Sequence, residues 1–345
     1  MKIVKKSSIR LNIEHPVTTT TLSQLASREG DAETVTLGPW KLTWRRFRKH
    51  KMALVALGGM IVIFVYIFLG GLVFARGVCT PTGQYVTAEA YANCNDTSIK
   101  LQPPSSEHPF GTDTIGRDIL ARTIYGGQIS LSIGVFAAIV EVVVGVLVGS
   151  IAGYFGRWLD DLLMRITEAM LIIPSLFLLI VLAKALGGKV PEIHLLGRSL
   201  SGSVVVIILV IGFTSWMYLA RIVRANVLSL KELDFISASR ALGVSDTRII
   251  FKHLLPNTIA PIIVSATLGV SGSILSEAYV SFLGLGVQTP TASWGNMLDS
   301  SVKYIQSAPW LWFFPGLLIL LTVLCINFIG DGLRDALDPR STRHI

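Results

Sequence analysis

Six apolar runs of about 20 residues constrain the fold most, because this is the length an α-helix needs to cross the hydrocarbon core of a bilayer. Of the 345 residues, 51% are hydrophobic and only 15% are charged, against about a quarter charged in soluble domains. The composition excludes an ordinary soluble enzyme and predicts an all-α polytopic membrane protein with six transmembrane helices. The six runs are Met52–Phe74, Ser130–Tyr154, Ile166–Leu186, Ser203–Ala220, Thr258–Phe282 and Trp310–Ile329.

The Lys and Arg residues predict how these helices are oriented. A basic flank, from Arg45 to Lys51, precedes the first run and is expected to stay in the cytoplasm. Six crossings then return the C-terminus to the cytoplasm, and most of the 30 Lys and Arg residues fall in cytoplasmic segments. Because they lie beside the spans, the net charge of +8 indicates contact with membrane lipid and no binding of nucleic acid.

These features divide the chain into segments in a predicted order. Trp40, Trp44 and Phe47 recur at helical spacing among basic residues, which favours a helix in the headgroup region over a plain basic flank. The segments are a disordered cytoplasmic tail (1–39), this interfacial amphipathic segment (40–51), the first transmembrane helix (52–75), an extracytoplasmic segment (76–129), a five-helix core (130–330) that includes a cytoplasmic loop (221–257), and a cytoplasmic C-terminal tail (331–345).

The cysteines and histidines give little sign of chemistry. Cys79 and Cys94 both lie in the extracytoplasmic segment, where a disulfide is permitted, although two free thiols fit the sequence equally well. Cys325 lies in the last span and is expected to be a packing residue. The six His residues are scattered without metal-ligand spacing, so no metal site is predicted. No GxxxxGK[ST] motif occurs, so we expect neither a nucleotide site nor catalysis on this chain.

Polar and small residues inside the spans indicate candidate functions within the membrane. Glu141 and Glu277 are ionisable at membrane depth, where charge is costly and marks a polar pathway by default. We take Glu277, Ser273 and Glu141 as candidates for a translocation path; structural pairing or a protonated carboxyl are the alternatives. The glycines at 145, 149 and 153 share one helix face and predict close helix packing, either within the chain or with another subunit.

The cytoplasmic segment 234–257 is predicted to form a compact knob. A short helix from Asp234 would break near Gly243, restart from a cap at Ser245 or Asp246, and stop before Pro256. A knob that carries both charged and apolar residues suggests a docking surface, and a solvated connecting hairpin is the alternative.

This segment resembles the EAA loop of ABC importer permeases. In that loop a Glu-Ala-Ala triplet is followed by a glycine and then by Ile-x-Leu-Pro. Here Ser237-Ala238-Ser239 stands at the triplet and Gly243 at the glycine. The closing positions hold His253 instead of isoleucine, followed by Leu255-Pro256. Four other segments resemble the C-type permease subunit of dipeptide, oligopeptide and nickel importers. They are Trp44–Ala53, His108–Asp118, Ser281–Gly286 with Trp294-Gly295, and Gly330–Pro339.

The resemblance implies the ABC type I importer permease fold in a bacterial or archaeal cytoplasmic (inner) membrane. It implies three kinds of partner: a second homologous permease subunit, two ABC ATPase subunits that hold ATP and Mg²⁺, and an extracytoplasmic solute-binding protein. Short peptides are the favoured substrate, and nickel or another small solute is the alternative within the family. Two alternatives of a different functional class are an ion-coupled secondary transporter and a membrane scaffold. The residues expected to couple ATPase movement to transport are Asp234, Ser237, Ala238, Ser239, Gly243, Asp246 and Pro256.

Overall fold

The computed structural model describes residues 39–338, except for 74–76, 80–83, 87, 187–188, 190, 192, 196–197 and 300. The predicted N-terminal tail lies outside the described residues, apart from Pro39. Contacts divide the chain into two units, residues 1–42 and residues 43–345, and the helices that carry the site belong to the second.

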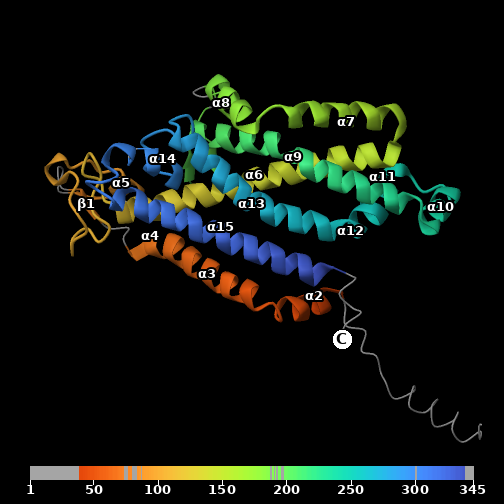
Figure 1. Cartoon of the computed structure of the whole chain (residues 1–345), viewed down its shortest axis with the longest axis horizontal. Helices are drawn as coiled ribbons and strands as arrows, with labels where there is room; N and C mark the ends of the chain where they lie inside the picture. Colours follow the sequence, from red (N-terminus) through yellow and green to blue (C-terminus); the bar gives the residue numbers. More distant parts are fainter. Residues whose placement is uncertain are drawn as a thin grey trace, which may run out of the picture. The chain divides into compact units, whose positions relative to one another are not determined.

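Among the described residues, five helices are long and apolar enough to span a membrane, or six if one bent pair counts as a single span. The five run side by side in the larger unit (Figure 1). They are α3 (Lys51–Phe68), α6 (Ile119–Phe155), α9 (Gly202–Lys231), α13 (Ile259–Phe282) and α15 (Trp310–Leu337), and the bent pair is α7 (Arg157–Ile172) with α8 (Ser175–Leu186). The prediction of a mainly helical, multi-span chain is confirmed.

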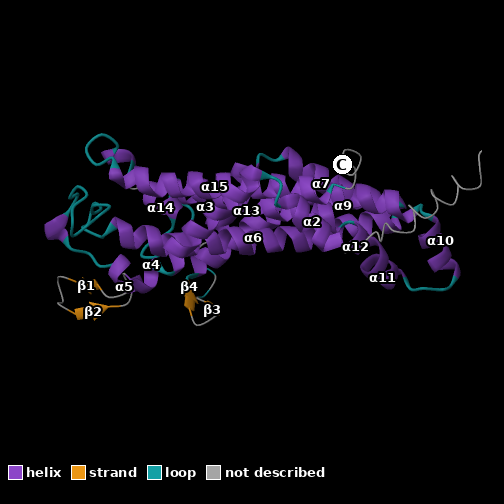
Figure 2. Ribbon diagram, turned by 90° about the horizontal axis from the view of Figure 1, so that it is seen from below, coloured by secondary structure: helices purple, strands orange, loops and turns teal. Residues whose placement is uncertain are grey.

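The shorter elements gather at opposite ends of the long helices. At one end, here called the knob end, lie α10 (Asp234–Ala241) and α11 (Asp246–Ile249); at the other, the distal end, lie α5 (Ala88–Ala92) and α14 (Trp294–Asp299) (Figure 1). Two short antiparallel hairpins, which the sequence did not predict, project beside the helices (Figure 2). The remaining elements are α2 (Pro39–Phe47), α4 (Gly70–Val73), β1 (Gly77–Cys79), β2 (Gln84–Val86), η1 (Thr97–Ile99), β3 (Ile193–Leu195), β4 (Arg198–Leu200), η2 (Ile250–Leu254), α12 (Leu255–Asn257) and η3 (Val302–Tyr304).

The helix of the second span, α6, begins at Ile119, eleven residues before the start of the predicted apolar run at Ser130. The side chain of Asp118 caps α6 by accepting a hydrogen bond from Ala121 N at 2.8 Å. The first turns of α6 contain Arg122, Thr123 and Gln128, which lower the local hydropathy but are buried in the protein. Gln128 Nε2, for example, donates to the carbonyl of Ile67 at 2.9 Å. A hydropathy pattern cannot detect a helix whose polar residues find partners inside the fold.

The third predicted span, Ile166–Leu186, is not one continuous helix. The axes of α7 and α8 meet at 92°, with Pro174 between them. Proline lacks a backbone N–H and disfavours helical geometry in the residue before it, and Ile173 has the extended angles φ −74° and ψ 125°. Pro174 therefore divides the apolar run into two helices.

The most extensive helix contact joins α6 to α9 through the predicted glycine face. A Cβ added at Gly145 would lie 3.0 Å from Leu219 Cβ, and one at Gly153 would lie 2.9 Å from Val227 Cβ. Such distances are too short for ordinary carbon contacts, so the missing side chains allow the close approach of α9. The glycines thus serve packing within the chain, the first of the two predicted alternatives.

The predicted interfacial segment 40–51 is helical from Pro39 to Phe47, where α2 ends before α3 begins. Trp44 stacks on Phe47 with ring centroids 5.9 Å apart. Trp44 is exposed, but Phe47 is buried and packs against Ala53 and Ala336. Part of the aromatic face therefore fixes α2 against α3 and α15. Helix α15 itself continues to Leu337, so the first part of the predicted tail 331–345 is helical.

Candidate functional site

The predicted knob is present. Helix α10 ends at Ala241, Gly243 has φ +75°, and α11 starts after Ser245. The prediction that the second helix stops before Pro256 is wrong. From Asp246 the chain stays helical to Asn257 through the π-helical turn η2, which brings Pro256 to the first turn of α12, where a missing N–H is tolerated.

The knob has an apolar interior and an exposed tip. Ile236, Ile249 and Leu254 are fully buried, while Leu242 beside the turn is 84% exposed. A large apolar side chain held in solvent by a packed scaffold is typical of a contact surface. Of the predicted coupling residues, Ser239 is half-buried and the others are exposed: Asp234, Ser237, Ala238, Gly243, Asp246 and Pro256.

Tyr154, at the knob end of α6, contacts both arms of the knob. Its hydroxyl donates to Asp246 Oδ1 at 2.5 Å, and the guanidinium carbon of Arg240 lies 5.0 Å from its ring centroid, a cation–π distance. Lys231 Nζ adds a hydrogen bond of 3.1 Å to the carbonyl of Gly153. These contacts join the knob to α6. No local sequence pattern predicts these contacts, because Tyr154 lies 92 residues from Asp246.

A cavity of about 490 Å³ lies among α6, the α7–α8 corner, α9 and α13. Glu141 and Ser273, two of the three predicted path residues, line it. The remaining lining is mainly apolar, with several further hydroxyl groups. The third predicted residue, Glu277, is not among the residues that line this cavity.

Glu277 is instead the centre of a buried hydrogen-bond cluster at the distal part of α13. It is 0% exposed, and Ser281 and Ser293 both donate to its Oε1 at 2.7 Å, while Ser130 donates to its Oε2 at 3.0 Å. Trp294 N donates in turn to Ser130 Oγ at 3.1 Å. The carboxyl group thereby joins α13, α6 and the start of α14.

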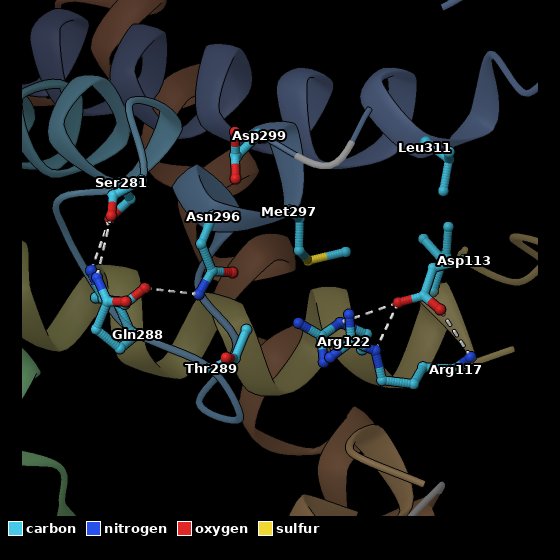
Figure 3. Close-up of a pocket in the computed structure, with 13 residues that line it drawn as sticks. Asp113, Arg117, Arg122, Ser281, Gln288, Thr289, Asn296, Met297, Asp299 and Leu311 are labelled. Atoms are coloured by element: carbon cyan, nitrogen blue, oxygen red, sulfur yellow. Dashed lines mark hydrogen bonds and ion pairs between the residues drawn. The ribbon is translucent and has the colours of Figure 1, made fainter. Parts of the chain in front are cut away.

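A second, smaller hollow of about 180 Å³ lies at the distal end (Figure 3). Figure 3 shows Arg117 and Arg122 directed at the carboxylate of Asp113; Arg117 Nε lies 2.6 Å and Arg122 Nε 4.0 Å from its Oδ2. This volume is below the roughly 300 Å³ usual for ligand pockets, and three of its charged side chains, Asp113, Arg117 and Arg122, already pair with one another. We interpret it as part of the structural end of α6.

The cysteine prediction is only partly visible. Cys94 is disulfide-bonded and Cys325 is free. The side chain of Cys79 lies outside what the structure describes, so its pairing with Cys94 stays a prediction. Within the described part of the chain, no three His, Cys, Asp or Glu residues are grouped so that they would hold a metal ion.

Comparison with known proteins decides the family. Residues 145–343, which include the knob, helices α7, α8, α9 and α13, and Glu277, match the binding-protein-dependent transport system inner membrane component family. The chain belongs to this family. It is therefore a multi-pass inner-membrane permease of an ABC transport system. Residues 38–104 match the N-terminal TM domain of oligopeptide transport permease C.

Individual relatives of this permease span almost its whole length. The dipeptide transport system permease protein DppC of Alkalihalophilus pseudofirmus is 43% identical, over 88% of this chain and 91% of that protein. The oligopeptide transport system permease protein OppC of Bacillus subtilis is 39% identical, over 91% of this chain and 95% of that protein. An inward-facing structure of the MetNI methionine ABC transporter matches with 20% identity and a TM-score of 0.48, covering 64% of this chain and 98% of that one.

The segments that resemble the permease family have identifiable roles in the structure. In the His108–Asp118 segment, Asp113 accepts hydrogen bonds from the backbone of Ile115 and Arg117, and His108 contacts the capping carboxylate of Asp118 at 2.7 Å. This segment fixes the distal start of α6. The Ser281–Gly286 and Trp294-Gly295 segments close around Glu277, since a Cβ at Gly295 would lie 3.0 Å from its Oε1.

Two features of the permease had no sequence signal. Arg224 in α9 donates two hydrogen bonds, of 2.5 and 2.6 Å, to the carboxylate of Asp160 in α7, a bidentate pair that fixes α7 beside α9. Ser130 and Ser293, the partners of Glu277, lie 147 and 16 residues from it. A single sequence gives no reason to choose these serines among many others.

Proposed function

We propose that this permease moves di- or oligopeptides into the cytoplasm in an ATP-driven importer. The observation that carries the proposal is the extent of the peptide permease relatives, which match about nine-tenths of this chain at about 40% identity. We further propose that it assembles with a second homologous permease, two ATPase subunits that bind ATP and Mg²⁺, and an extracytoplasmic solute-binding protein. In this assembly the chain itself hydrolyses no ATP.

The geometry of the knob supports a coupling role for the 234–257 loop. Exposed Leu242 and the residues around it would dock on an ATPase subunit in the cytoplasm. Movement of that subunit would then reach α6 through Tyr154, which contacts both Arg240 and Asp246. The tilting of α6 would open the cavity at Glu141 and Ser273 alternately to the two sides of the membrane.

A Tyr154→Phe variant tests this route. It removes the hydroxyl that bonds to Asp246 but keeps the ring beneath Arg240, so we expect peptide uptake per ATP hydrolysed to fall by about two- to fivefold. The measurement is uptake and ATPase activity of the same reconstituted transporter. Phe155→Tyr, on an exposed neighbouring ring, is the matched control. Equal coupling ratios in Tyr154→Phe and the unaltered chain would argue against the route.

The proposed function as a whole is tested in two steps. Purification of the tagged chain from its native membrane in mild detergent should recover a second permease and ATPase subunits, identified by mass spectrometry. Cells that lack the chain should then lose uptake of radiolabelled Ala-Ala and regain it with a plasmid copy. Recovery of the chain alone, or Ala-Ala uptake that is independent of it, would refute the proposal.

A further inference from the structure

The electrostatic character of the 490 Å³ cavity is set by one residue. Among the described residues that line it, Glu141 is the only one with a carboxyl or a basic side chain. Hydroxyl groups from Ser175, Ser265 and Ser276 also line it, and the rest of the lining is mainly aliphatic. An ionised Glu141 therefore gives the cavity a net negative charge.

Glu141 itself lacks a partner within the described part of the chain. It is 8% exposed, and neither a hydrogen bond nor an ion pair reaches its carboxylate there. Space for the carboxylate comes from Gly269 in α13, where a Cβ would lie 2.8 Å from Glu141 Oε2. A carboxylate in a low-dielectric site is costly unless a positive group approaches it, so the cavity favours entry of a cation.

Ser273 gives a second, independent sign that the cavity is made for a ligand. It is 2% exposed, and its Oγ has no hydrogen-bond partner among the described residues. Unpartnered buried hydroxyls are rare in folded proteins, because each costs about 1–3 kcal/mol. A ligand with hydrogen-bonding groups would satisfy Ser273 while its cationic group meets Glu141.

We propose that Glu141 and Ser273 form a transient binding site for the protonated amino group of the transported molecule. The proposal rests on the proposed peptide import, because the free α-amino group of a short peptide is such a cation. The cavity volume lies in the range of roughly 300–1,000 Å³ that is usual for small-molecule sites. The blocked N-terminus of an acetylated peptide lacks the charge and would not be held.

The surroundings of the cavity offer a route for release. Tyr218 and Ile222 of α9 line both the cavity and an open groove of about 1,050 Å³ between α7 and α9. The groove contains both acidic and basic side chains, including Arg221 and Glu168. A cation that leaves Glu141 along α9 thus passes from a mainly apolar chamber into a polar one.

A cysteine reporter tests the charge of the cavity without requiring transport. Ser276→Cys places a thiol on the half-buried part of the wall, in a Cys325→Ala background that removes the free native cysteine. The experiment uses membranes that hold the assembled transporter. It measures how fast the introduced thiol reacts with two methanethiosulfonate reagents, one that carries a trimethylammonium group and one that carries a sulfonate. Each rate is divided by the rate at which the same reagent modifies a small free thiol. We expect the cationic reagent to be favoured about tenfold.

Two further variants give the controls. Glu141→Gln should reduce the preference for the cationic reagent to that of the free thiol. Glu107→Gln, which removes an exposed carboxylate that lines neither the cavity nor the groove, should leave the preference unchanged. Equal rates for the two reagents in the Ser276→Cys chain, or no reaction with either, would overturn the proposal.

Peptide protection completes the test. Ala-Ala should slow the modification of Ser276→Cys at least about twofold, and N-acetyl-Ala-Ala should not. Protection by both peptides, or by neither, would overturn the assignment to an amino group. These results are separate from the proposed function, because the uptake experiment can fail while the reagent preference at Glu141 remains.

Discussion

Replacing Gly243 with proline is expected to reduce ATP-driven peptide uptake by about tenfold or more, while the chain still inserts into the membrane. Gly243 has φ +75°, whereas proline requires about −65° and has no N–H. The hydrogen bond of 2.9 Å from Gly243 N to the carbonyl of Arg240 would be lost, and the turn that presents Leu242 would change direction. Uptake and ATPase activity of the reconstituted transporter would show the loss as uncoupling.

The matched control at this position is Gly243→Asn. Asparagine tolerates positive φ better than most residues, and no atom lies within 4 Å of a Cβ added there. The asparagine variant should therefore keep most of the uptake. Normal coupling of ATP hydrolysis to uptake in Gly243→Pro would show that the knob does not transmit ATPase movement. Equal losses of uptake in the proline and asparagine variants would show that the added side chain, and not the changed backbone turn, is the cause.

The second large effect is expected from Glu277→Leu. Three serine hydroxyls would lose their buried acceptor at once, which costs about 3 kcal/mol or more in the free energy of unfolding. Because the cluster joins α6, α13 and α14, we expect a lower melting temperature of the purified complex and less chain in the membrane. Both are measurable by thermal unfolding in detergent and by immunoblotting.

Glu277→Gln separates a structural from a transport role for this residue. Glutamine keeps an acceptor oxygen, and its amide can donate to a reoriented serine hydroxyl, so stability should largely return. If Glu277 serves structure, uptake per folded complex should also return. If the glutamine variant is stable but does not transport, the carboxyl group has the path role that the sequence suggested.

The helices of this permease could be predicted from sequence wherever membrane exposure or a turn signal dominates. Apolar runs located the five long helices, and the turn at Gly243 could be placed because few other residues suit that backbone. The early start of α6 could not be predicted, because the polar side chains of Arg122 and Gln128 are buried and find their hydrogen-bond partners inside the protein. Pro174 was visible in the sequence, but a run of apolar residues on both sides concealed its effect.

The candidate site was less predictable than the fold. Sequence position indicates that Glu141 and Glu277 lie at membrane depth, yet it cannot tell a carboxyl that faces a cavity from one enclosed by serines. The distinction depends on Ser130 in α6, on Ser293 in the loop before α14, and on Gly269, which leaves room beside Glu141. Such long-range contacts follow from the packing of α13 against α6, which no local pattern encodes.

The contact between Tyr154 and the knob lies at one end of an unusually long helix. With 37 residues, α6 extends over about 55 Å as a single rod, and its glycine face fixes α9 against it. A tilt of about 5° around the knob end moves the opposite end by about 5 Å, by simple leverage over that length. In the proposed coupling route, a small rotation received at Tyr154 would thereby move Asp118, at the opposite end of α6, by nearly the diameter of a peptide backbone.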